Sequence, residues 1–208
     1  TPKEIVLPFK GYISEAFSNA NKPGVAFIME SWTHPPGGYV YDADTRALAS
    51  LKLAPAAVFD SDQFAVVDTS AAARDGTKIP LTLIRRRDAH GPQVTVLNAY
   101  GSYGISSTPA FSRMLVMVQM GGNWAECHVR GGGELGEAWR LAGKDAKKPN
   151  TWNDLIACAQ DLIARGVTTK ERLFLWGGSA GGIAVGRAMT DRPEMFAGVI
   201  DDVPAANM

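Results

Sequence analysis

The pattern of apolar and polar residues changes character near residue 75 of this 208-residue chain. Before that point, apolar residues form short runs rich in β-branched and aromatic side chains, separated by Pro-Pro-Gly-Gly and Asp-Ala-Asp segments. Runs of this kind predict β-strands joined by turns. The strands expected from them are residues 24–32, 39–41 and 64–69. Asp75 and Gly76 then connect the last strand to residues 79–86, which predicts a β-hairpin.

After residue 90 the pattern alternates between short apolar runs and helical periodicity. The strands expected there are residues 94–98, 115–119, 125–129, 172–176 and 198–201. The clearest helix covers residues 151–165, because its apolar residues recur at intervals of three and four positions. Thr151 with Asp154 resembles a capping box at its start, and Gly166 suits its end. With a second helix at 181–190, the alternation predicts a parallel sheet covered by helices on both faces.

A G-x-S-x-G motif, residues 177–181, lies between the expected strand 172–176 and the expected helix 181–190. In that strand–turn–helix setting the central Ser179 stands on a tight, strained turn with its hydroxyl above the sheet edge. Glycine is needed at both ends of the motif, since larger side chains there would collide with the neighbouring strand and helix. The motif therefore predicts Ser179 as a catalytic nucleophile.

The same turn also predicts where negative charge would be stabilised. The N-terminus of the following helix places partial positive charge near an oxyanion that forms at Ser179, and the backbone N–H of Ala180 can donate to it. A phosphate-binding loop or a plain tight turn is the alternative interpretation. A phosphate loop would end in Lys followed by Ser or Thr, whereas Gly182 and Ile183 stand at that place.

Composition narrows the classes of partner. Hydrophobic residues make up 46% of the chain, which suits one well-filled domain or two small ones. Lys and Arg number 21 and Asp and Glu also number 21, so no basic surplus exists and we expect no nucleic-acid partner. No apolar run is long enough to cross a bilayer and no basic amphipathic stretch is present, so we expect no membrane partner.

The cysteines and histidines carry little positive signal. Cys127 and Cys158 lie in apolar segments, and we interpret them as two buried, reduced thiols. Reduced thiols favour the cytoplasm, while a periplasmic or secreted location stays open if a leader was removed, since the chain lacks an initiator Met. His34, His90 and His128 are far apart and show no ligand spacing, so we expect no metal and no cofactor.

Several further segments share one family resemblance. The segments, in order, are 98–106 (NAYGSYGIS), 128–139 (HVRGGGELGEAW), 148–154 (KPNTWND), 177–182 (GGSAGG) and 192–196 (RPEMF). Together they resemble the prolyl oligopeptidase family of serine peptidases. Residues 31–44 are similar to the last blade of that family's β-propeller, and residues 73–80 to the start of its hydrolase domain.

The resemblance implies a fold class and two domains. Residues 1–75 would form the C-terminal part of a β-propeller, and residues 76–208 the N-terminal half of a catalytic domain. The expected class is α/β, a partial α/β-hydrolase fold with a mostly parallel sheet and helices on both faces. A β segment from the end of the propeller would precede it.

The resemblance also implies roles for individual residues. Ser179 matches the family's nucleophile and Ala180 the residue whose N–H serves the oxyanion hole. Tyr100 matches the tyrosine whose hydroxyl is the second oxyanion donor, and its place after the strand 94–98 puts it at the same sheet edge as Ser179. The alternative for Tyr100 is an aromatic that packs on a helix. Tyr103 is a candidate substrate-binding residue, whereas we expect Glu134 to form a structural ion pair.

The serine lacks the partners that a catalytic triad requires. In α/β-hydrolases an acid and then a His follow the serine, but no His follows Ser179. Asp201 and Asp202 are expected to pair with cations or cap a loop rather than act as the acid. We therefore expect an internal fragment, inactive by itself, whose partner is the remainder of the same polypeptide.

The resemblance leaves three interpretations of the function open. The first is an endopeptidase that cleaves short peptides after proline through an acyl-enzyme on Ser179. The second is an oligopeptidase B-like enzyme that cleaves after basic residues, since residues 100–106 and 128–136 look equally like that relative. The third is a non-catalytic fragment or subunit. A carboxylate pair in the specificity pocket would favour the second.

Overall fold

The computed structural model describes residues 4–53 and 60–205, which form two compact units. The first unit comprises the chain up to Asp62 with Thr108–Leu115, and the second comprises Gln63–Ser107 with Val116 onward. The expected division at residue 75 is therefore wrong for the structure. Residues 64–72 pair along their whole length with the next strand of the second unit, so the boundary lies before that hairpin and not within it.

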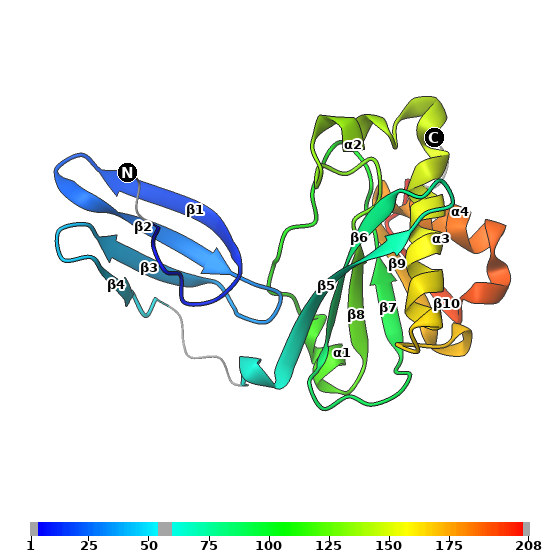
Figure 1. The fold of residues 1–208 in the computed structure, drawn as a ribbon, viewed down its shortest axis with the longest axis horizontal. Helices are drawn as coiled ribbons and strands as arrows, with labels where there is room; N and C mark the ends of the chain where they lie inside the picture. The colour runs from blue at the N-terminus through cyan, green and yellow to red at the C-terminus, as the bar shows by residue number, and fades with distance from the viewer. Residues whose placement is uncertain (1–3, 54–59, 206–208) are drawn as a thin grey trace. The chain divides into compact units, whose positions relative to one another are not determined.

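The first unit contains a four-stranded antiparallel sheet in the order β1-β2-β3-β4 (Figure 1). Its strands are β1 (Tyr12–Asn19), β2 (Lys22–Glu30), β3 (Gly37–Asp42) and β4 (Ala47–Ser50). The turn after β3 forms because the Asp42 carboxylate accepts hydrogen bonds from the backbone N–H groups of Asp44 and Thr45. The sequence pattern identified β2 and β3 but not β1, whose residues are all exposed and show no inward–outward alternation.

The second unit is built on a six-stranded sheet in the order β10-β9-β7-β8-β6-β5. Its strands are β5 (Phe64–Ala72), β6 (Lys78–Arg86), β7 (Thr95–Asn98), β8 (Asn123–Cys127), β9 (Leu173–Gly178) and β10 (Gly198–Asp202). The β5–β6 hairpin is antiparallel, as expected, and β7 to β10 pair in parallel. The described sheet is thus α/β in character, with one antiparallel hairpin at its edge.

The helices of the second unit join the parallel strands. They are α1 (Leu115–Gln119), α2 (Glu137–Leu141), α3 (Pro149–Ala164) and α4 (Gly181–Asp191), with short 3₁₀ turns η2 (Asp145–Lys147), η3 (Lys170–Arg172) and η4 (Pro193–Met195). One more 3₁₀ turn, η1 (Ser61–Gln63), precedes β5 where the first unit ends. Helices α3 and α4 contact each other and the sheet, so they share one face (Figure 1). Buried and half-buried residues alternate along β9, so its opposite face is only partly covered by the described residues.

One expected strand is a helix. Residues 115–119 form α1, and the strand that follows is β8 at Asn123–Cys127 instead of residues 125–129. A five-residue apolar run does not distinguish a strand from a buried helix by periodicity. Because β7 and β8 are parallel neighbours, the chain between them must cross over the sheet, and such connections usually contain a helix.

The start of α3 also differs from the expected capping box. The helix begins at Pro149, a residue suited to the first helical position, and Lys148 caps it without a side-chain hydrogen bond. Thr151 and Asp154 lie inside the helix, fully buried, and both bind Arg130 instead. The end of the helix follows the prediction, because Gly166 adopts a φ of +68°.

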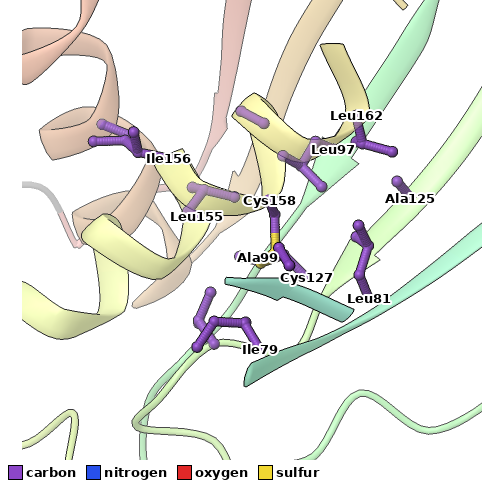
Figure 2. Packing of buried hydrophobic residues seen from close by; sticks show 14 of the residues in the cluster. Ile79, Leu81, Leu97, Ala99, Ala125, Cys127, Leu155, Ile156, Cys158 and Leu162 are labelled. Atoms are coloured by element: carbon purple, nitrogen blue, oxygen red, sulfur yellow. A yellow bond between two sulfur atoms is a disulfide. The ribbon is translucent and has the colours of Figure 1, made fainter. Parts of the chain in front are cut away.

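The core lies between α3 and the sheet and encloses a disulfide (Figure 2). Leu155 and Leu162 of α3 are fully buried there with Leu81 of β6. Cys127 at the end of β8 and Cys158 in α3 are joined, with their Cα atoms 6.2 Å apart, so the prediction of two reduced thiols is wrong. Packing of α3 on β8 brings together two residues 31 positions apart, which spacing in the sequence does not reveal.

Candidate active site

Ser179 occupies the turn between β9 and α4 that the motif predicts. Its φ is +52°, a left-handed conformation that non-glycine residues rarely adopt, so the expected strain is present. Backbone hydrogen bonds maintain it. The Ser179 N–H donates to the carbonyl of Asp202 at 3.0 Å, and the Ser179 carbonyl accepts from Gly182 at 3.0 Å and Ala205 at 2.8 Å. The turn is thus fixed by β10 and the residues after it.

The glycines of the motif are required by close contacts. A Cβ on Gly177 would lie 2.6 Å from the carbonyl oxygen of Gly181 and 2.8 Å from both methyl groups of Val185. A Cβ on Gly181 would lie 2.7 Å from the carbonyl oxygen of Ala99 and 3.4 Å from the Cα of Tyr100. The first helical turn of α4 therefore lies directly against the chain that leaves β7.

Tyr100 and Ser179 follow the two neighbouring strands, β7 and β9, between which the strand order of the sheet reverses. From β7 the chain moves to β8 on one side, whereas from β9 it moves to β10 on the other. Asn98 pairs with Trp176, so the residues that follow β7 and β9 leave the sheet at the same carboxyl edge. Crevices of this kind between diverging connections are the usual ligand sites of open α/β sheets.

The two expected oxyanion donors differ in burial. Ala180 is buried, at 2% exposed, and caps α4; its N–H donates to no backbone carbonyl among the residues that the structure describes. Tyr100 is half-buried, and its ring centre lies 6.4 Å from that of Tyr103 at a tilt of 51°. Its hydroxyl makes no hydrogen bond to the described part of the chain, so it is free to donate to another molecule.

Tyr103 lies on the wall of a cleft of about 900 Å³ between the start of α3 and α4. It is 69% exposed and adopts a φ of +59°. Lys148 and Arg187 also line this cleft, as does Asp201, whereas Ser179 does not. The expectation that Tyr103 contacts substrate therefore stays a prediction, supported by its exposure beside Tyr100.

Residues 130–134, which we call the floor, lie directly against residues 101–104. A Cβ on Gly131 would overlap the carbonyl of Gly101, and one on Gly133 would overlap the carbonyl of Gly104, so the glycines permit direct backbone contact. The Gly104 N–H donates to the carbonyl of Gly131 at 3.0 Å. Glu134 lies 3.5 Å from His128, so the ion pair predicted for Glu134 exists only when the His128 imidazole is protonated.

Arg130 connects the floor to two carboxylates, those of Asp154 and Asp75. Its guanidinium donates to both oxygens of Asp154, at 2.6 and 2.9 Å, and to Asp75 at 2.6 Å. The hydrogen bond from Arg130 holds the pKa of Asp75 well below its usual range. Spacing in the sequence does not reveal this network, because Arg130 lies 24 positions from Asp154 and 55 from Asp75.

The histidines lie away from Ser179. His34 bonds Ser31 and Thr33 within the first unit, and His128 bonds Thr82 across β8 and β6. His90 precedes β7, at the edge of the sheet opposite to Ser179. Across residues 4–53 and 60–205, none is placed to remove the proton from the Ser179 hydroxyl.

Asp201 and Asp202 end β10 beside the elbow. Asp202 supports Ser179 through its backbone carbonyl, and the side chain of neither residue forms an ion pair with a described cation. Burial raises the pKa of Asp201, and its Oδ1 is buried without a hydrogen bond against α4. Pairing with cations, one of the two roles expected for these residues, is absent from the described chain, and the other role, capping a loop, stays a prediction.

The residues that the structure describes contain neither a long apolar helix nor a cluster of metal-binding side chains. None of the helices there is long and apolar enough to cross a membrane. Nor do three or more His, Cys, Asp or Glu side chains gather there in a group that could hold a metal ion.

A strained serine between a parallel strand and a helix, at the reversal of the strand order, defines an α/β-hydrolase site. The sequence model of the prolyl oligopeptidase family matches residues 109–208. A prolyl endopeptidase from Elizabethkingia meningoseptica is 32% identical over 196 residues, which cover 93% of this chain and 28% of that protein. The chain thus belongs to the prolyl oligopeptidase family of serine peptidases.

Solved structures agree with this placement. A prolyl endopeptidase structure matches with a TM-score of 0.88 and 32% identity, covering 96% of this chain and 30% of that one. Oligopeptidase B from Trypanosoma brucei, with covalently bound antipain, matches with a TM-score of 0.81 and 37% identity, covering 87% and 26%. The chain therefore spans less than a third of the length of each of these relatives.

Proposed function

We propose that the complete protein hydrolyses peptide bonds in short peptides through an acyl-enzyme on Ser179. The Ser179 oxygen attacks the scissile carbonyl, its proton passes to a base, and the carbonyl oxygen becomes an oxyanion. The amine then leaves with a proton, and water releases the acyl group and restores the hydroxyl. The observation that carries the proposal is the left-handed Ser179 at the sheet edge with Tyr100 beside its helix.

The oxyanion would be held by the Ala180 N–H and the Tyr100 hydroxyl. Both donors lack hydrogen-bond partners within the described residues, so both are available when the oxyanion forms. The base and the acid of the triad come, in this proposal, from the remainder of the same polypeptide. That remainder is also the partner proposed for the exposed edge of β10.

Cleavage after proline is the first specificity we propose, in line with the prolyl endopeptidases among the relatives. Cleavage after basic residues is the second candidate, because the likeness to oligopeptidase B is of similar strength. The Cys127–Cys158 disulfide removes the argument for a reducing compartment and favours the alternative, a periplasmic or secreted location.

A fluorophosphonate probe tests the nucleophile in the full-length protein. Ser179 should be the single labelled serine, and labelling elsewhere would refute the assignment. Prolyl and arginyl aryl-amide peptides, assayed side by side, then separate the two specificities. A higher kcat/KM for the arginyl substrate would replace the first specificity by the second.

The 208-residue chain by itself should not turn over either substrate, since no described histidine serves Ser179. A purified, monodisperse sample that hydrolyses a prolyl aryl amide at an enzymatic rate would contradict this expectation.

A further inference from the structure

The segment that carries Tyr100 has a strained backbone with one internal hydrogen bond, from the Ile105 N–H to the Ser102 carbonyl at 3.1 Å. We call residues 100–107 the tyrosine loop. Gly101, Tyr103 and Gly104 all adopt positive φ values, of +66°, +59° and +70°. The conformation of Tyr103 is costly for a non-glycine residue, and its side chain is too exposed to be fixed by packing. Contacts from outside the loop add to that internal bond, and the Gly104 N–H donates to the carbonyl of Gly131 at 3.0 Å.

Lys148 bonds the two residues that follow Tyr100. Its ammonium group donates to the carbonyl of Gly101 at 2.7 Å and to the hydroxyl of Ser102 at 2.9 Å. These acceptors belong to the first and second residues after Tyr100. Glu134 anchors the far end, where its carboxylate accepts from the N–H of Ser107 at 2.9 Å.

The cation at Lys148 has no counterion among the residues of the described chain. No carboxylate there lies within ion-pair distance of its Nζ, although Lys148 is half-buried. Burial lowers the pKa of Lys148, which reflects the cost of holding its charge there. A partly buried ammonium group without a carboxylate partner contributes little to the stability of the fold. The contribution of Lys148 is therefore the pair of hydrogen bonds that it donates to Gly101 and Ser102.

The position of Lys148 makes those bonds precise. It is the residue before Pro149, at the junction of η2 and α3, so the main chain that carries it is fixed by a rigid helix. Gly101 in turn packs against α3, because a Cβ there would overlap the side chain of Thr151. Helix α3 thus positions both Lys148 and the part of the tyrosine loop to which Lys148 donates its hydrogen bonds.

We propose that Lys148 is a positioning residue for catalysis: its ammonium group fixes Gly101 and Ser102 and thereby directs the Tyr100 hydroxyl toward the oxyanion at Ser179. This inference rests on the proposed role of Tyr100. It adds a requirement that the resemblance to known peptidases did not supply, namely a charged side chain 48 positions away that determines where the donor points.

Lys148→Met in the full-length enzyme tests the proposal, with Lys147→Met as the matched control. Lys147 is the exposed neighbour in the same segment and should leave kcat unchanged. Lys148→Met should lower kcat by about 10- to 100-fold with KM little altered, because a misplaced catalytic group loses that much. An unchanged kcat in folded Lys148→Met would overturn the proposal.

A double-mutant cycle separates positioning from general stability. If Lys148 acts through the Tyr100 hydroxyl, Lys148→Met should reduce kcat little further in a Tyr100→Phe background. Losses that multiply would show that Lys148 acts elsewhere and would refute the inference. If Tyr100→Phe alone leaves kcat intact, the proposed oxyanion role fails instead, and the two failures are distinguished.

Ser102→Ala provides the second variant if Lys148→Met does not fold. It removes one of the two acceptors and leaves the Gly101 carbonyl in place. We expect a smaller fall in kcat that is again not additive with Tyr100→Phe. Full activity in Ser102→Ala, together with additivity, would likewise count against the proposal.

Discussion

The nucleophile elbow and the tyrosine loop meet at one sheet edge but are held by different means. The elbow is fixed by backbone hydrogen bonds to Ser179 and by glycines that admit no side chain. The tyrosine loop also has backbone contacts with Gly131 and Gly133, but charged side chains bind both of its ends, Lys148 at one and Glu134 at the other. A motif of five consecutive residues reveals the first arrangement, whereas the second depends on residues that only the fold brings together.

Of changes in the two regions, removal of the nucleophile from the elbow should have the largest effect on activity. Ser179→Ala leaves the backbone bonds of the elbow intact, so folding should be retained. The turnover number should fall by about 10⁶-fold, the scale seen when a serine nucleophile is lost. Steady-state kinetics of the full-length enzyme measures it, and residual activity above a trace would mean that another group attacks the substrate.

Removing the oxyanion hydroxyl should have the next largest effect. Tyr100→Phe keeps the ring and its contact with Tyr103, so stability should barely change. The loss should be about 10²–10³-fold in kcat, or roughly 3–4 kcal/mol, because the oxyanion exists only after attack. KM should stay nearly constant. A variant with full kcat would assign the second donor to a backbone group.

A larger side chain at the contact between Gly181 of the elbow and Ala99, which precedes the tyrosine loop, should lower the stability of the fold. Gly181→Ala places a Cβ 2.7 Å from the Ala99 carbonyl oxygen, and an overpacked contact costs about 1–3 kcal/mol. Gly178→Ala is the matched control, since its nearest neighbour would lie at an ordinary 3.7 Å. Thermal unfolding should separate the two variants. Equal melting temperatures would mean that the chain after β7 can move away from α4.

The smallest effect should come from the acid that supports the floor of the tyrosine loop. Arg130 lowers the pKa of Asp75 in the folded state, so Asp75 contributes stability above its ordinary pKa of about 4. That contribution is lost as the pH falls from about 5 toward the lower folded value. Because Asp75 is about half exposed, the contribution should be below about 1 kcal/mol.

Asp75→Asn should therefore lower the melting temperature slightly at pH 7 and narrow the difference between pH 7 and pH 4. A variant that loses as much stability on acidification as the parent protein would show that other carboxylates dominate the acid response.

Sequence reasoning succeeded where the determinants are local. The long periodic helix α3, the strand–turn–helix at Ser179 and the β5–β6 hairpin each depend on neighbouring residues. It failed where tertiary contacts decide. Thr151 and Asp154 resembled a cap, but burial assigns both to Arg130. The apolar run of α1 was ambiguous because a crossover, not periodicity, determines its conformation.

The same distinction applies to the site. Ser179, Ala180 and Tyr100 could be named because a short motif or a family segment contains each of them. Lys148 lies within such a segment, yet nothing in its spacing shows that its ammonium group reaches Gly101. Directed bonds between distant residues become visible only once the fold places them.

The Cys127–Cys158 disulfide has one consequence for how this site is assembled. Arg130, Glu134 and Lys148 all lie between the two cysteines, so a single covalent ring contains the floor and both anchors of the tyrosine loop. Closing a ring of this size removes roughly 3–4 kcal/mol of conformational freedom from the unfolded chain. The residues that orient Tyr100 therefore share one covalent restraint, and a reductant that opened the ring would remove that restraint from all of them together.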